Sequence, residues 1–139
     1  MIPIFPEAQR GVFEMTISCS CEQSVAIYRK RDRTLRITIT GPGDLTGAKI
    51  WFSVKQELGD DDDDALITKK SANNGGTDLQ AKVYDGENGI IEVYILPEDT
   101  EDIAEGDYWF DVVIETSSGR RLEAVSPSRF RIIQPVTMT

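Results

Sequence analysis

The chain has 139 residues, a net charge of −9, two cysteines and no histidine. This length suits one domain with its own core, and 40% hydrophobic with 28% charged residues is the composition of a globular protein rather than a disordered one. The negative charge argues against nucleic acid as a partner, and the lack of histidine excludes Ser-His-Asp and Cys-His triads and His-based metal sites.

The predicted elements begin after a short N-terminal segment. Residues 1–11, with Pro3 and Pro6, are expected to form an arm, and residues 12–139 a single β-sandwich domain. This start lacks the basic and apolar regions of a signal peptide, and no apolar run is long enough to cross a membrane. We therefore expect a reducing compartment and no membrane partner.

Cys19 and Cys21 lie two positions apart in "ISCSCEQ". On a strand both thiols share one face, and a bridge between them would be strained. No further cysteine and no histidine is present to complete a metal site. We expect two free thiols, no metal and no other cofactor.

Alternation of apolar and polar residues with a period of two is the main signal along the rest of the chain. It predicts strands over 34–40, 48–55, 89–96, 107–115 and 128–134, with weaker candidates at 12–19, 24–30, 66–70, 79–84 and 120–125. The side chains expected to face the core are Leu35, Ile37, Ile39, Ile50, Phe52, Val54, Ile91, Val93, Ile95, Tyr108, Phe110, Val112, Ile114, Phe130 and Ile132.

Glycine-rich turn signals separate most of these runs, and Gly119 is expected at the turn of a hairpin. "LPEDTEDI" (96–103) is the one helical candidate, since Pro97 opens it and acidic residues fill its first turn. Many short strands without βαβ alternation predict an all-β, immunoglobulin-like antiparallel sandwich with one short helical turn.

"EGDYWF" (105–110) places a tyrosine two residues before an inward apolar position, just past a short corner. A tyrosine corner of an immunoglobulin-like domain has this arrangement, with Phe110 where an antibody domain carries its second cysteine. The alternative is that Tyr108 is an ordinary core tyrosine.

Five consecutive aspartates, Asp60 to Asp64, raise the question of a cation site. An EF-hand loop requires Gly at its sixth position and Glu at its twelfth, where this run has Ala65 and Ser71. Adjacent like charges also repel one another. We interpret the run as a solvated connection between strands, with a weakly bound cation as the alternative.

Two tryptophans are expected on the outside of one sheet. If Phe52 and Phe110 face the core, alternation turns Trp51, Trp109 and Val113 outward on strands that neighbour each other in an immunoglobulin-like order. An exposed apolar patch of this kind marks an interface. The alternatives are that the N-terminal arm or a loop covers one tryptophan, or that the register differs by one residue.

The order of segments resembles a family of small phage and prophage tail proteins with an immunoglobulin-like domain, like the N-terminal module of the baseplate upper protein. The resemblance covers 34–134 and depends on the following segments, in order: "RTLRITIT", "DLTGAKIWFSVK", "DDALITKKS", "NGIIEVYILPEDTEDIAEGDYWFDVVIE" and "SGRRLEAVSPSRFRII". It implies a structural subunit of the virion, made in the bacterial cytoplasm, that assembles with copies of itself and with other virion proteins. It carries over no catalytic or binding residue.

Two other classes of function remain open at this stage. Trp51, Trp109 and Tyr94 could stack on sugar rings in a carbohydrate- or host-surface-binding module, which would require them to share one groove. Glu92 and Glu115 could act as the paired carboxylates of an enzyme, although nothing in their spacing singles out an acid–base pair. We expect the chain not to be an enzyme.

Overall fold

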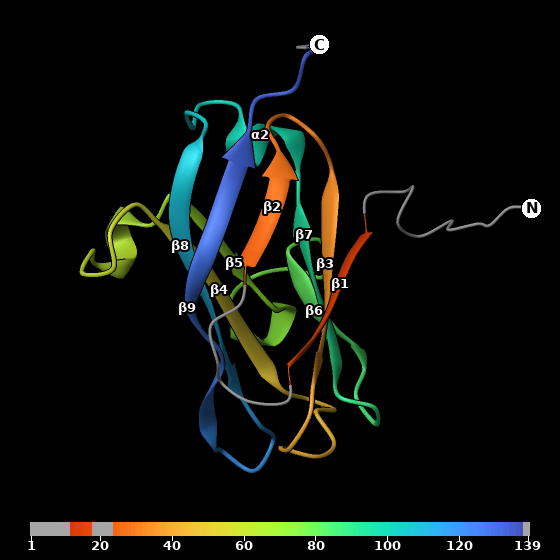
Figure 1. The fold of residues 1–139 in the computed structure, drawn as a ribbon. Coiled ribbons are helices and arrows are strands. Elements are labelled where there is room, and N and C mark those ends of the chain that lie inside the picture. The colour runs from red at the N-terminus through yellow and green to blue at the C-terminus, as the bar shows by residue number, and fades with distance from the viewer. Residues whose placement is uncertain (1–11, 18–23, 138–139) are drawn as a thin grey trace, which may run out of the picture.

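The computed structural model describes residues 12–17 and 24–137, which form two packed β-sheets (Figure 1). Cys19, Cys21 and the expected N-terminal arm at 1–11 lie outside the described residues. One sheet contains, in spatial order, β1 (Val12–Ile17), β3 (Arg33–Ile39), β7 (Ile90–Ile95) and β6 (Ala81–Asp85). The other contains β2 (Ser24–Tyr28), β9 (Arg121–Ile133), β8 (Gly106–Glu115), β4 (Lys49–Lys55) and β5 (Ile67–Lys70).

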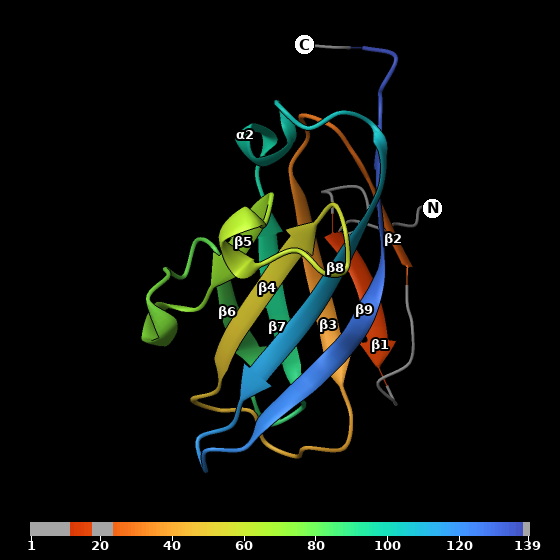
Figure 2. The ribbon, with the colours of Figure 1, turned by 90° about the vertical axis from the view of Figure 1, so that its left-hand side faces the viewer.

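The strand order is that of an immunoglobulin-like sandwich. Strands β3, β7 and β6 occupy the places of B, E and D, and β9, β8 and β4 those of G, F and C. Neighbouring strands are antiparallel except for two pairs, β1 with β3 and β2 with β9, which are parallel. The predicted all-β, immunoglobulin-like sandwich is therefore confirmed, and Figure 2 shows its two layers.

The core lies between the two layers, where the alternating apolar residues meet. All fifteen side chains expected to face inward are buried there. The rings of Phe52, Phe110 and Phe130 lie on three neighbouring strands with centroids 5.7–6.1 Å apart, in tilted and edge-to-face arrangements. Such pairs add stabilisation to that of their buried area, which fixes the inner face of the second sheet.

Strand β9 differs from the sequence-based expectation. The runs 120–125 and 128–134 were predicted as separate strands, but Arg121–Ile133 is one strand with two irregularities in its pairing with β8. Ala124 and Val125 are both buried, and Pro127 lies where the register shifts. A bulge accepts an extra residue and tolerates a proline, which cannot donate to the ladder. The inward–outward alternation therefore shifts at the bulge without ending the strand.

The hairpin expected at Gly119 is confirmed. The Gly119 amide donates to the Thr116 carbonyl at 2.8 Å, and Gly119 has φ of +91°. The predicted helical turn is confirmed as α2 (Pro97–Thr100). Two further short 3-10 turns were not predicted, at η1 (Asp62–Asp64) and η2 (Ala72–Asn74). None of the helices among the described residues has the length and apolar character needed to span a membrane.

A tyrosine corner closes the top of the sandwich beside α2. The Tyr108 hydroxyl donates to the carbonyl of Ala104 at 2.7 Å, while its ring is buried at the start of β8. Thr100 of α2 is buried and its hydroxyl accepts from the Lys30 amide at 2.8 Å. The connection between β7 and β8 is thus held against the turn that joins β2 to β3, and the predicted corner is confirmed.

Candidate functional site

Trp51, Trp109 and Val113 lie on the outer side of the second sheet, as the alternation predicts. Val113 pairs directly with Trp51 across β8 and β4, whereas Trp109 pairs with Lys55. Ser53 and Asp111 form the pair between them, so the three residues do not make one continuous apolar area. We call this outer side of β9, β8 and β4, centred on Trp51, Trp109 and Val113, the tryptophan face; its role as an interface stays a prediction.

Arginines from β9 cover both tryptophans in part. The guanidinium carbons of Arg121 and Arg129 lie 4.9 Å from the ring centroids of Trp51 and Trp109, respectively. Each contact is a cation–π interaction worth roughly 0.5–1 kcal/mol at a surface. The tryptophans and Val113 are therefore partly buried rather than fully exposed.

Asp111 and Glu123 form a hydrogen-bonded carboxyl pair on the same face. They come from β8 and β9, and Glu123 pairs across the strands with Val113. Desolvation, followed by the hydrogen bond and the charge of Asp111, raises the pKa of Glu123 to about 8. Glu123 therefore keeps its proton near neutral pH, because a second negative charge beside Asp111 would be costly.

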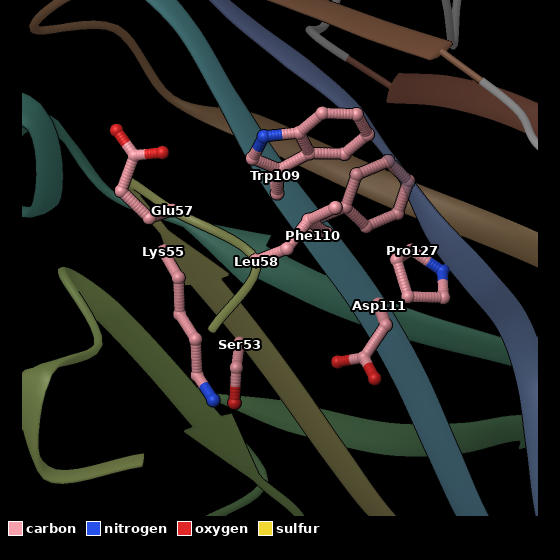
Figure 3. A pocket seen from close by; sticks show the side chains of 8 residues that line it. All are labelled: Ser53, Lys55, Glu57, Leu58, Trp109, Phe110, Asp111 and Pro127. Atoms are coloured by element: carbon pink, nitrogen blue, oxygen red, sulfur yellow. The ribbon is translucent and has the colours of Figure 1, made fainter. Parts of the chain in front are cut away.

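A small depression lies on this face, beside Trp109. Its cavity volume is about 70 Å³, which holds one or two waters and is well below the several hundred Å³ of a typical small-molecule site. Figure 3 shows the side chains that line it: Ser53, Lys55, Glu57, Leu58, Trp109, Phe110, Asp111 and Pro127. The depression suits the seat of a protein side chain better than an enclosed ligand.

The aspartate run forms part of the connection between β4 and β5, so its prediction as a link between strands is confirmed. Asp61 to Asp64 are exposed. The Lys55 ammonium group holds the connection by donating to Asp62 at 2.8 Å and to the Asp60 carbonyl at 2.9 Å. This bond raises the pKa of Lys55 and lowers that of Asp62.

Arg129 and a further arginine of β9, Arg131, lie at the opposite margin of the sheet, next to β2. Arg131 donates to Asp107 at 2.8 Å, and Arg129 lies 3.5 Å from the same carboxylate. The hydrogen bond from Arg131 lowers the pKa of Asp107. These three described residues therefore combine two positive charges with one negative charge.

The structure separates the residues of the other two candidate functions. Tyr94 belongs to β7 in the first sheet, and its hydroxyl donates to Glu92, so it shares no face with the tryptophans. Glu92 also accepts from Arg36 at 2.8 Å, whereas Glu115 lies on β8 and pairs with Arg121. Neither the three aromatic residues nor the two glutamates are brought together.

The sequence reasoning missed the arginines and Glu123. Their positions follow only from the pairing of β8 with β9, in which two irregularities shift the register. A partial signal was present: Arg129 and Arg131 alternate with Phe130 and Ile132, so they could have been placed beside Trp109 on the outer side of the sheet. The contacts of Arg121 and Glu123 depend on the register beyond the two irregularities, which the sequence of β9 alone does not indicate.

No family model matches the chain, and no curated protein matches it. Solved structures that match the chain include the following three. The N-terminal domain of phage TP901-1 ORF48 gives a TM-score of 0.47 at 14% identity, covering 88% of this chain and 97% of that one. CopC from Methylosinus trichosporium OB3b gives 0.45 at 16% identity, covering 86% and 91%. The first Ig-like domain of human CD48 antigen gives 0.38 at 12% identity, covering 88% and 94%. Because all three scores are below 0.5, the fold assignment rests on strand order and burial.

Proposed function

We propose that this protein is an assembly module that acts through protein–protein contacts, as a structural subunit of a phage or prophage tail or baseplate. The observation that carries the assembly role is the tryptophan face, where two tryptophans lie under arginines on an open sheet. Tryptophan and arginine are the residues most enriched among those that dominate binding energy at interfaces. The virion assignment is supported by the order of segments from "RTLRITIT" to "SGRRLEAVSPSRFRII".

The module is proposed to use its rigid sheet rather than a pocket. Strands β4, β8 and β9 pair in a fixed register, and their inner side chains are buried in the core. This arrangement holds the outer side chains of the three strands in place. Arg121 is further held by Glu115 at 2.9 Å and Arg129 by its place over Trp109. Side chains that are ordered before binding lose less conformational entropy when a partner arrives. No catalytic step forms part of this proposal.

The test is co-expression with the products of the genes on either side of this one. We expect those genes to encode tail or head proteins, and at least one product to co-purify with the chain. Replacing both Trp51 and Trp109 by Ala should weaken that binding roughly tenfold or more, as loss of interface anchors does.

The matched control is Tyr84→Ala, an exposed aromatic residue of the first sheet whose ring stacks with Arg36 at 4.3 Å. This control should leave the binding unchanged. Neighbouring genes unrelated to virions, or products that fail to bind the wild-type chain, would count against the proposal.

A further inference from the structure

The aspartate connection stands out from the tryptophan face. Figures 1 and 2 show the link between β4 and β5 projecting from the side of the second sheet, and its residues Glu57 and Leu58 line the depression next to Trp109. The run carries five carboxylates, and Lys55 binds one of them at Asp62. This projecting element therefore has a negative surplus.

A recess with the opposite charge lies at the other margin of the same face. Its cavity volume is about 470 Å³, and it is lined by the exposed Arg129 and Arg131 together with Ser24, Val25, Ala26 and Asp107. Ser24 and Ala26 are small and pair with Arg129 and Arg131, respectively, so β2 leaves room beside both guanidinium groups. Among the residues that line the recess, Arg129 and Arg131 share the carboxylate of Asp107, so this lining carries a net positive charge.

We propose that a second copy of this chain docks on the tryptophan face and places its Asp60–Asp64 connection in the recess beside Arg129 and Arg131. The inference rests on the proposed assembly function and names one partner for it. Carboxylates meeting guanidinium groups form short, charge-assisted hydrogen bonds, and complementary charge fixes the register of an interface.

The two elements are placed so that both contacts form at once. In the order β2-β9-β8-β4-β5, the connection lies at the β4–β5 margin and the recess at the β2–β9 margin. At the usual strand spacing of about 4.8 Å, β9 and β5 are roughly 14 Å apart. A two-fold axis that runs along β8 places the β4–β5 margin of each copy over the β2–β9 margin of the other. This gives a closed dimer with Trp109 near its centre.

The overall charge of −9 does not prevent this contact at moderate salt. At about 0.15 M salt the Debye length is roughly 8 Å, so repulsion between the distant parts of two copies is largely screened. The paired charges within the contact are closer than this length and are screened less. Self-association is therefore expected to depend on which charges are reversed, and not on net charge alone.

The experiment measures the dimer dissociation constant by analytical ultracentrifugation of the full chain. D61R/D63R reverses the charge of the loop, and R129E/R131E reverses the charge of the recess. Each double variant should raise the dimer dissociation constant roughly tenfold or more. D61R/D63R leaves the Asp62–Lys55 pair in place. D78R/E87R changes two exposed residues in the turns that flank β6 and gives a control with the same change in net charge. An equimolar mixture of the two reversed variants should form a heterodimer, since one of its two contacts joins the reversed loop to the reversed recess and the other joins the two unchanged elements.

A wild-type chain that remains monomeric at high concentration would overturn this inference, as would a dimer that D61R/D63R leaves unchanged. The D61R/D63R result decides the matter even if R129E/R131E fails to fold, because its substitutions lie on an exposed connection. A monomer that still binds the neighbouring gene products would refute self-docking and leave the proposed function standing. A charge-dependent dimer that binds none of the neighbouring gene products would support self-docking and count against the proposed function.

Discussion

Glu123 is an acidic residue with a strongly raised pKa. Partial desolvation, followed by its hydrogen bond to Asp111, raises its pKa to about 8, from an ordinary value of 4.5. The folded protein therefore holds a proton that the unfolded chain has already released. A raised acidic pKa means that stability is greatest below about pH 4.5 and is lost as the pH rises through about 8.

Glu123→Gln should remove this dependence. We expect the urea midpoint of the wild-type protein to fall between about pH 5 and about pH 9, and the midpoint of the variant to fall less, because an amide has no proton to release. Glu87→Gln, at an exposed position in the turn between β6 and β7, is the matched control and should keep the wild-type fall. Equal slopes for wild type and Glu123→Gln would show that Glu123 does not hold this proton.

The direction of a side chain was easier to predict than its partners. Alternation placed Ile37, Phe110 and Ile132 in the core because a period of two depends only on local sequence. Glu92 was expected on an outer face and lies there, yet it is buried, because Arg36 and Tyr94 from neighbouring positions close over it. The burial of Glu92 depends in part on Arg36 of the neighbouring strand β3, which the pattern of β7 alone does not contain.

At the scale of elements, a buried ion pair joins the edge strand β5 to α2. The Lys69 ammonium group lies 2.6 Å from Asp99, with 6% of the Lys69 side chain exposed. Asp99 also accepts from the Leu96 amide at 2.7 Å, which caps the first turn of α2. Alternation in the short strand β5 turns Lys69 inward, to the same side as Ile67.

Removing the two partners of this pair should have unequal effects. Asp99→Asn leaves a buried ammonium group without its counter-ion and should cost about 3 kcal/mol of unfolding free energy. Lys69→Met fills similar space and leaves Asp99 partly hydrated, so about 1 kcal/mol is expected. The double variant should cost less than the sum, as measured by urea unfolding in a double-mutant cycle. Additive losses would mean that the pair is not coupled.

Element boundaries followed the turn signals, with one failure at β9. Gly119 and the Pro97 turn were placed correctly because their backbone requirements are local. The runs 120–125 and 128–134 were predicted as two strands; Pro127 lies between them, and a proline cannot donate to a ladder. The strand continues because bulges around this position absorb the missing donor, and a bulge is specified by the partner strand β8 as much as by β9 itself.

For the whole molecule, the three contacting phenylalanines Phe52, Phe110 and Phe130 tie the inner face of the second sheet to the core. Phe110→Ala removes contacts with both Phe52 and Phe130 and should lower the unfolding free energy by about 4 kcal/mol. That is a large share of the 5–15 kcal/mol typical of a domain. Leu79→Ala, at a side chain that is 78% exposed, is the control and should change stability by less than about 0.5 kcal/mol. Similar losses in urea unfolding would contradict this description of the core.

The parallel pairing of β2 with β9 joins the beginning of the described chain to its end, since Ser24 lies opposite Arg129 and Tyr28 opposite Ile133. During synthesis, β2 leaves the ribosome long before its neighbour exists. Closing a loop of roughly a hundred residues is slow compared with forming a hairpin. The margin with the arginine recess is thus completed last, so a nascent chain has no finished docking surface until translation has passed β9.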